Sequence, residues 1–132
     1  MKKLKGFVLM LLISLSFFGL TACGNADNTA SYEQISPAEA KEIMDTAKDY
    51  IIIDARTDEE FKEGHISGAI MIPEYEIAER AEKELPDKDA LILVYCRSGR
   101  RSKIASEELV KLGYTNVKEF GGIIDWPYEI VK

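Results

Sequence analysis

Cysteine and histidine, the residues that staple small domains together, are scarce in this sequence. Its 132 residues contain two cysteines and one histidine. Because Cys23 directly follows an N-terminal export segment and is expected to be modified, Cys96 has no disulfide partner in the rest of the chain. A four-ligand zinc site is excluded as well, since one free cysteine and one histidine supply too few ligands. The sequence therefore predicts neither a metal nor a cofactor, and it leaves Cys96 as a lone thiol.

Positive charge is also in short supply. The chain has 17 lysines and arginines against 23 acidic residues, for a net charge of −6. A general nucleic-acid binder would show a basic face over much of its domain, so this class is excluded. Apolar residues are not lacking, at 46% of the chain. That share supports a real core, and the length suits one domain better than two.

The first 22 residues are expected to be an export signal. Three lysines precede an uncharged, mostly apolar run from Gly6 to Leu20. This run is shorter than the ~20 residues that a membrane-spanning helix needs. "LTAC" at 20–23 resembles the lipobox of bacterial lipoproteins. The resemblance implies that Cys23 carries lipid and anchors the protein on the extracytoplasmic face of a bacterial membrane; an ordinary cleaved signal with a chance cysteine is the alternative. Residues 23–31 read as the lipidated cysteine and a flexible tether.

Strand and helix patterns alternate over the predicted domain, residues 32–132. Two capping boxes, Ser36 to Glu39 and Thr57 to Glu60, predict the starts of two helices. Short apolar runs without polar alternation indicate strands that are covered on both faces. Strands are expected at 32–35, 50–54, 68–73, 90–95 and 116–120, and helices at 36–49, 57–64, 74–85 and 101–113. This order predicts an α/β fold, a parallel sheet with helices on both faces.

Cys96 directly follows the strongest predicted strand and precedes a helix. In open parallel sheets, ligands bind at the carboxyl ends of the strands, so Cys96 stands where chemistry is expected. In "CRSGRRS", Gly99 allows successive amides to converge on an anion, and Arg97, Arg100 and Arg101 add positive charge. Such surroundings stabilise a nucleophilic thiolate. The alternative is that Cys96 fills the core and the arginines are merely solvated.

Four segments in order give the chain a family resemblance. They are "DARTDEEF" at 54–61, "EGHISGAIMIP" at 63–73, "VYCRSGRRS" at 94–102 and "LGYTNVKEFGGIIDW" at 112–126. Together they resemble a single-domain rhodanese, a thiosulfate sulfurtransferase. The resemblance implies a three-layer fold with five parallel strands. It also implies that Cys96 takes sulfane sulfur from a donor such as thiosulfate, becomes a persulfide and passes the sulfur to a thiol or a cyanide-like acceptor. The expected active loop consists of Cys96, Arg97, Ser98, Gly99, Arg100 and Arg101, with Ser102 following it.

Two other functions are possible on the same fold. Related phosphatases and arsenate reductases have a loop one residue longer, with arginine six positions after the cysteine. Here that position is Ser102, and Arg101 comes one place early. The shorter loop favours a sulfur group over phosphate. The remaining alternative is a sulfur carrier or partner-binding module without turnover.

Four further residues are expected to support the pocket. The resemblance places Asp54 and Arg56 at its rim, as a pair that holds a loop. His65, the only histidine, is interpreted as a backbone-bonding residue rather than a base for Cys96. Trp126, in the closing turn after Gly121 and Gly122, either walls the pocket or caps the core. The protein is expected to be a monomer.

Overall fold

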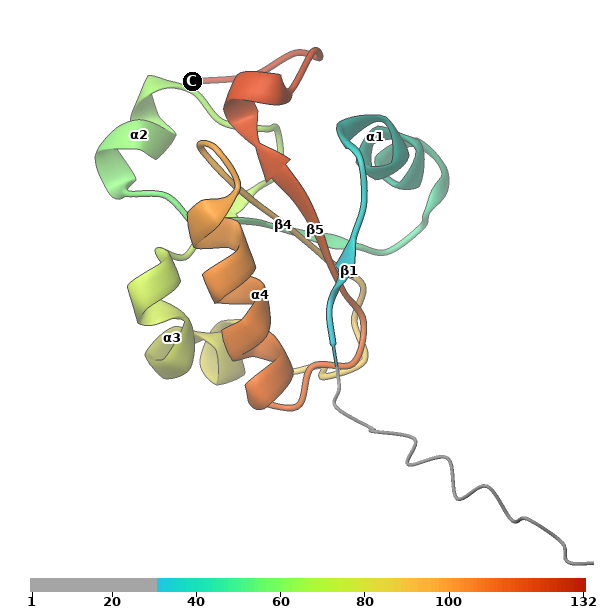
Figure 1. The fold of residues 1–132 in the computed structure, drawn as a ribbon, viewed down its shortest axis with the longest axis vertical. Coiled ribbons are helices and arrows are strands. Elements are labelled where there is room, and N and C mark those ends of the chain that lie inside the picture. Colours follow the sequence, from blue (N-terminus) through green and yellow to red (C-terminus); the bar gives the residue numbers. More distant parts are fainter. Residues whose placement is uncertain (1–30) are drawn as a thin grey trace, which may run out of the picture.

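A five-stranded parallel sheet is the frame of the fold (Figure 1). The computed structural model describes residues 31–132, so the predicted export signal, Cys23 and most of the predicted tether lie outside the described residues. The strand order is β1-β5-β4-β2-β3, and every neighbouring pair is parallel. The strands are β1 (Glu33–Gln34), β2 (Ile51–Asp54), β3 (Ile70–Met71), β4 (Ile92–Cys96) and β5 (Val117–Gly122). The predicted α/β fold class is confirmed.

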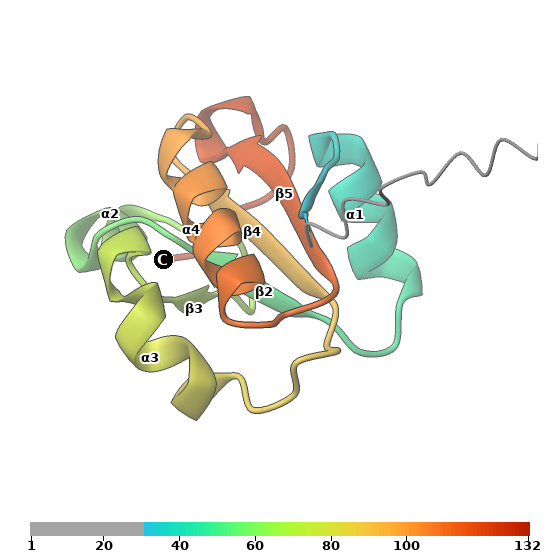
Figure 2. The same ribbon diagram turned by 60° about the horizontal axis from the view of Figure 1, so that its bottom comes forward.

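Helices cover both faces of this sheet, as Figure 2 shows. The α-helices are α1 (Pro37–Thr46), α2 (Asp58–Glu63), α3 (Ile77–Glu84) and α4 (Arg100–Lys111), and the 3₁₀ helices are η1 (Glu74–Glu76) and η2 (Ile123–Asp125). α3 and α4 pack on one face and α1 packs on the other. Among residues 31–132, no helix is both long and apolar enough to cross a membrane.

The central strand β4 explains why its sequence is apolar without alternation. Ile92, Val94 and Cys96 belong to the core cluster under α3 and α4. Leu93 and Tyr95 belong to the cluster on the α1 face. Successive side chains of a strand point to opposite faces, so a strand buried on both faces needs apolar residues at every position. The same alternation places the Cys96 thiol on the α4 side of the sheet.

Both predicted capping boxes are present at the helix starts. The Glu39 amide donates to Ser36 Oγ at 3.2 Å, and Ser36 N donates to Glu39 Oε2 at 2.7 Å. Thr57 and Glu60 make the same reciprocal pair at the start of α2. Each box satisfies amides that the first helical turn leaves without partners.

Several predicted elements differ by a few residues in extent from the observed ones. The strand expected over 68–73 pairs only at Ile70–Met71, because Gly68 has φ of +82° and Pro73 has no amide to donate. The helix expected over 74–85 opens as η1, where the Glu76 amide donates to the Pro73 carbonyl. The last long helix begins at Arg100, one residue earlier than predicted.

Candidate active site

Cys96 is the last residue of β4, at the carboxyl end of the central strand. Residues 97–99 form a short connection, and α4 starts at Arg100. The cysteine is 1% exposed, so its thiol lies beneath this loop rather than on the surface. The strand-to-helix position agrees with the sequence prediction, and burial gives the sulfur a low-dielectric surrounding in which each nearby polar group has a strong effect.

Two groups contact the sulfur directly. The Gly99 amide donates a hydrogen bond to Cys96 Sγ at 3.0 Å, and Ser102 Oγ lies 3.3 Å from Sγ. Gly99 has φ of +104°, a left-handed conformation that glycine adopts without steric cost. This conformation turns its amide toward the sulfur. In the described loop the hydrogen bond to the sulfur therefore comes from one amide, whereas the sequence pattern predicts several that converge.

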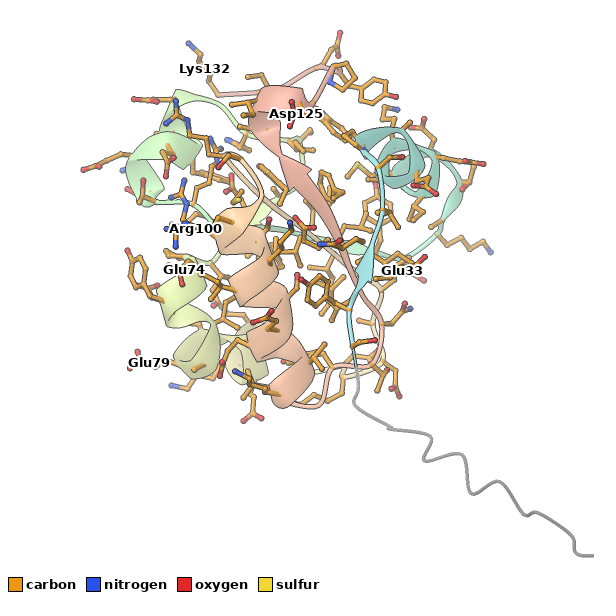
Figure 3. The ribbon with its side chains drawn as sticks, viewed as in Figure 1. Glu33, Glu74, Glu79, Arg100, Asp125 and Lys132 are labelled. Atoms are coloured by element: carbon orange, nitrogen blue, oxygen red, sulfur yellow. The ribbon has the colours of Figure 1, made fainter. Side chains whose placement is uncertain are left out.

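The loop arginines divide into two kinds. Arg101 turns away to α2, where it donates to both carboxylate oxygens of Glu60 at 2.7 and 2.8 Å. That hydrogen-bonded guanidinium lowers the pKa of Glu60 to about 2. Arg97 and Arg100 are exposed, and Figure 3 shows Arg100 at the start of α4. The three arginines thus differ in what they contact: Glu60 is the first cause of the raised pKa of Arg101, and the Cys96 sulfur adds to it, so Arg101 also acts on the thiol through its charge.

The closing turn after β5 holds the loop from the other side. The Ile124 amide donates to the Arg97 carbonyl at 3.3 Å. Gly122 packs so closely that a Cβ atom there would lie 2.0 Å from the same carbonyl oxygen. Only glycine fits at this approach, so the "GG" of the sequence has a steric reason.

Asp54 and Arg56 form a buried pair that does not touch Cys96. Arg56 Nη2 donates to Asp54 Oδ2 at 2.7 Å and to the Gly64 carbonyl at 2.6 Å. The Tyr95 hydroxyl donates to Asp54 Oδ2 at 2.7 Å and accepts the Ile66 amide at 3.1 Å. Burial, followed by the Asp54 charge, raises the pKa of Tyr95. This network fixes the segment around residues 64–66 on the α1 face, opposite to the thiol.

His65 and Trp126 also lie away from the sulfur. His65 Nδ1 is 2.9 Å from the Phe61 carbonyl, and the ring stacks on Phe61 with centroids 3.7 Å apart. Trp126 is 9% exposed and belongs to the α1-side core with Tyr95 and Phe120. It also lines a cavity of about 600 Å³ together with residues of α1, and Cys96 is not among that cavity's lining residues.

One residue beside the thiol is not predicted by the sequence patterns. Glu119 on β5 is 2% exposed, and its Oε1 accepts the Ser102 hydroxyl at 2.6 Å and the Gly121 amide at 2.8 Å. A signal for it exists, since the ends of adjacent parallel strands meet at one edge of a sheet and the strand expected at 116–120 ends beside Glu119. Ser102, the residue that follows the predicted active loop, thus connects Cys96 to a buried carboxylate.

Among residues 31–132, the one cysteine lies at the end of a central parallel strand, under the short loop that precedes α4. This is the arrangement of an α/β protein whose site is built around one thiol. The family description "Rhodanese-like domain" matches residues 36–127, and the chain belongs to this family. Thiosulfate sulfurtransferase PspE of Escherichia coli is 44% identical over 80 residues, 61% of this chain and 77% of that protein. Thiosulfate sulfurtransferase GlpE of Coxiella burnetii is 34% identical over 96 residues, 72% of this chain and 87% of that protein.

Solved structures agree with the sequence relatives. A rhodanese from Escherichia coli, solved with anions, superposes with a TM-score of 0.60 at 41% identity. The match covers 63% of this chain and 98% of that one. The chain therefore shares the rhodanese fold.

Proposed function

We propose that this protein is a sulfurtransferase that carries sulfane sulfur on Cys96. The observation that carries the proposal is the position of the thiol. It lies at the end of β4 under a loop whose Gly99 amide hydrogen-bonds the sulfur at 3.0 Å. That amide stabilises negative charge on the sulfur before and after transfer, without reorganisation. The relatives named thiosulfate sulfurtransferase support thiosulfate as a donor.

The reaction proceeds in two sulfur exchanges. The Cys96 thiolate attacks the outer sulfur of thiosulfate, a new S–S bond forms, and sulfite leaves with the electron pair of the old S–S bond. A thiophilic acceptor, such as cyanide or a thiolate, then attacks the outer sulfur of the persulfide. The Cys96 thiolate leaves and is ready for another donor. Covalent catalysis of this kind splits one difficult exchange into two easier ones.

The geometry also argues for sulfur over phosphate. A phosphate would need donors for several oxygens. The position six residues after Cys96 is Ser102, which is buried and within hydrogen-bond distance of the sulfur. Arg101, one place earlier, is held by Glu60. The arginine fork that would bind a phosphate bidentately is therefore committed elsewhere.

Thiocyanate formation from thiosulfate and cyanide tests this function. The wild-type protein is expected to turn over, and Cys96→Ser is expected to be inactive because a hydroxyl of far higher pKa is not an effective nucleophile here. Circular dichroism of both proteins controls for folding. If Cys96 accepts sulfur but no thiocyanate forms, the protein acts as a sulfur carrier. If the wild type instead hydrolyses an aryl phosphate readily and accepts no sulfur, the proposal is wrong.

We further propose that Cys23, outside the described residues, anchors the domain to the extracytoplasmic face of a bacterial membrane. The basis is the sequence "LTAC" after the apolar run. Stable anchoring takes more than one lipid chain, which the diacylglycerol of a lipoprotein supplies. Fractionation of cells that produce Cys23→Ala tests this point. Mature, processed variant protein that still sediments with membranes would contradict it.

A further inference from the structure

A chain of three side chains leads from the thiol into the protein. Cys96 Sγ lies 3.3 Å from Ser102 Oγ, and Ser102 Oγ lies 2.6 Å from Glu119 Oε1. All three residues are at most 2% exposed. Glu119 shares the α4 face of β5 with Val117, which belongs to the same core cluster as Cys96. The carboxylate thus lies one hydroxyl group away from the nucleophile.

The carboxylate of Glu119 has no cation to balance it. Among residues 31–132 it forms no ion pair, and its two hydrogen bonds come from a neutral hydroxyl and a neutral amide. A buried charge without a partner is costly, and two negative charges in one site disfavour each other. A thiolate on Cys96 and a carboxylate on Glu119 therefore oppose one another.

The other charged groups around the site do not cancel this opposition. Arg101 of α4 is paired with Glu60 of α2, which is the first cause of its raised pKa, while the Cys96 sulfur is a lesser one. Arg97 in the loop and Arg100 at the start of α4 are exposed. Exposed Lys103 lines the shallow depression of about 290 Å³ that also borders Glu119. Lys118 of β5 is paired with Glu33 of β1. Asp54 and Arg56 neutralise each other on the opposite face. Tyr32 and exposed Glu107 stand on the Glu119 side, and burial, followed by the charges of Glu107 and Glu119, raises the pKa of Tyr32.

Ser102 has a single hydroxyl proton, which has the Gly99 and Gly121 carbonyls at 3.0 and 3.3 Å as further acceptors, but its contact with Glu119 Oε1 is the shortest at 2.6 Å. With one proton between Cys96 and Glu119, two arrangements then connect the two groups through Ser102. In the first, the Cys96 thiol donates to Ser102 Oγ and the Ser102 hydroxyl donates to the Glu119 carboxylate. In the second, the Ser102 hydroxyl donates to a Cys96 thiolate and a protonated Glu119 donates to Ser102. The two arrangements differ by two linked proton transfers, from Cys96 to Ser102 and from Ser102 to Glu119, and the total charge of the site is the same in both.

We propose that Cys96 and Glu119 share one proton through Ser102, so that Glu119 stores the proton whenever the sulfur is the nucleophile. This inference rests on the proposed sulfur transfer. The S–H bond of Cys96 breaks as its proton passes to Ser102 Oγ, and the hydroxyl proton of Ser102 passes to Glu119 Oε1. The thiolate attacks the donor while the proton stays on Glu119. Glu119 is thus a positioning residue, and Ser102 connects it to the reacting atom.

Alkylation of Cys96 by iodoacetamide as a function of pH tests the sharing, with the Cys96 peptide read by mass spectrometry. Glu119→Gln keeps an oxygen that can accept from Ser102 but removes the charge. In the wild type, alkylation is expected to rise in two steps, a partial one while the proton is shared and a complete one when that proton leaves. In Glu119→Gln it should rise in one step, with a midpoint about one pH unit or more below the upper midpoint of the wild type. Ser102→Ala keeps the charge of Glu119 but removes the hydroxyl that connects Glu119 to Cys96, and the midpoint of its alkylation profile should not fall. Glu107→Gln removes an exposed carboxylate as the matched control, and its profile should superimpose on that of the wild type.

Superimposable profiles for Glu119→Gln and the wild type would overturn the inference. Infrared spectra of the wild type give a second test without a substitution at Glu119. Protein with Cys96→Ser serves as the blank that isolates the S–H band of Cys96. At a pH where the site holds one proton, the S–H band and the band of a protonated carboxyl should both be present at partial intensity, and both should vanish as the last proton leaves at higher pH. Absence of the carboxyl band while the S–H band is partly lost contradicts proton sharing.

Sulfur uptake measured in the same samples separates this inference from the proposed function. Thiosulfate-treated wild type that gains sulfur on Cys96, with superimposable alkylation profiles, refutes the proton sharing alone. A shifted Glu119→Gln profile without sulfur uptake in any protein supports the sharing and refutes the transfer function.

Discussion

The guanidinium of Arg101 and the carboxylate of Glu60 meet in two hydrogen bonds of 2.7 and 2.8 Å. The pair connects the start of α4 to α2, and so ties the active loop to the segment that follows β2. Glu60 also accepts the Thr57 amide at 3.0 Å as part of its capping box. One carboxylate therefore fixes both the start of a helix and the end of the loop that covers Cys96.

The first prediction concerns this pair and pH. The pKa of Glu60 is lowered to about 2 by Arg101, so the pair stabilises the fold fully above about pH 4.5, and this contribution is lost as the pH falls toward 2. Glu60→Gln keeps the capping oxygen but removes the charge. Both side chains are partly exposed, and we expect a loss of roughly 1 kcal/mol at pH 7. Urea unfolding at pH 7 and near pH 3 measures it.

The difference between wild type and Glu60→Gln should shrink at the lower pH. Glu63→Gln, an exposed carboxylate at the end of the same helix, serves as the control. An equal loss of stability in both variants at pH 7 would show that the pair contributes nothing specific.

Gly122→Ala is expected to disable the active loop. The new Cβ would collide with the Arg97 carbonyl, which it would approach to 2.0 Å, and the loop must move. Overpacking of this kind costs about 1–3 kcal/mol. A displaced thiol should lower thiocyanate formation by about a hundredfold, since misplacement of about 1 Å has effects of that size.

Gly68→Ala is the matched control for this variant. Gly68 has φ of +82°, and a Cβ added there would have nothing within 4 Å; the residue is also far from the loop in sequence. Its strain should cost about 1–2 kcal/mol. If Gly68→Ala loses about as much stability as Gly122→Ala but keeps full activity, the loss of activity in Gly122→Ala comes from the collision at the loop. A fully active Gly122→Ala would mean that the loop tolerates the collision.

Tyr95→Phe is expected to reduce stability while sparing the chemistry. Its hydroxyl donates to the buried Asp54 carboxylate at 2.7 Å on the face opposite to Cys96. Loss of a hydrogen bond to a charged group should cost about 1.5–3 kcal/mol. Tyr114→Phe, whose hydroxyl donates to the neutral Leu85 carbonyl at 2.6 Å, should cost only about 1 kcal/mol. Thermal unfolding ranks the two variants, and a larger loss for Tyr114→Phe would contradict the role given to Asp54.

Local sequence patterns are sufficient to predict the frame of this protein. The apolar run ending at Cys96, the two capping boxes and the alternation of strands and helices are all signals within a few residues. They place the thiol at the carboxyl edge of the sheet. Gly99 likewise predicts the turn that directs its amide toward the sulfur.

The contacts that complete the site are of another kind. Arg101 pairs with Glu60, and Tyr95 with Asp54, each across 41 residues. Nothing near Arg101 in the sequence distinguishes it from Arg97 or Arg100, which remain exposed. Glu119 directly follows another charged residue, Lys118, in the same strand. Only the packing of α4 on β5 shows that Glu119 is the buried one of the two. Such pairings depend on the tertiary fold, and local patterns do not encode them.

The mass of the purified protein after treatment with thiosulfate tests the central claim most directly. The account predicts one added sulfur atom, located on the peptide that contains Cys96, removed by cyanide and absent from Cys96→Ser. An unmodified Cys96 after treatment with thiosulfate and other sulfane donors, in folded protein whose thiol still reacts with iodoacetamide, would contradict it.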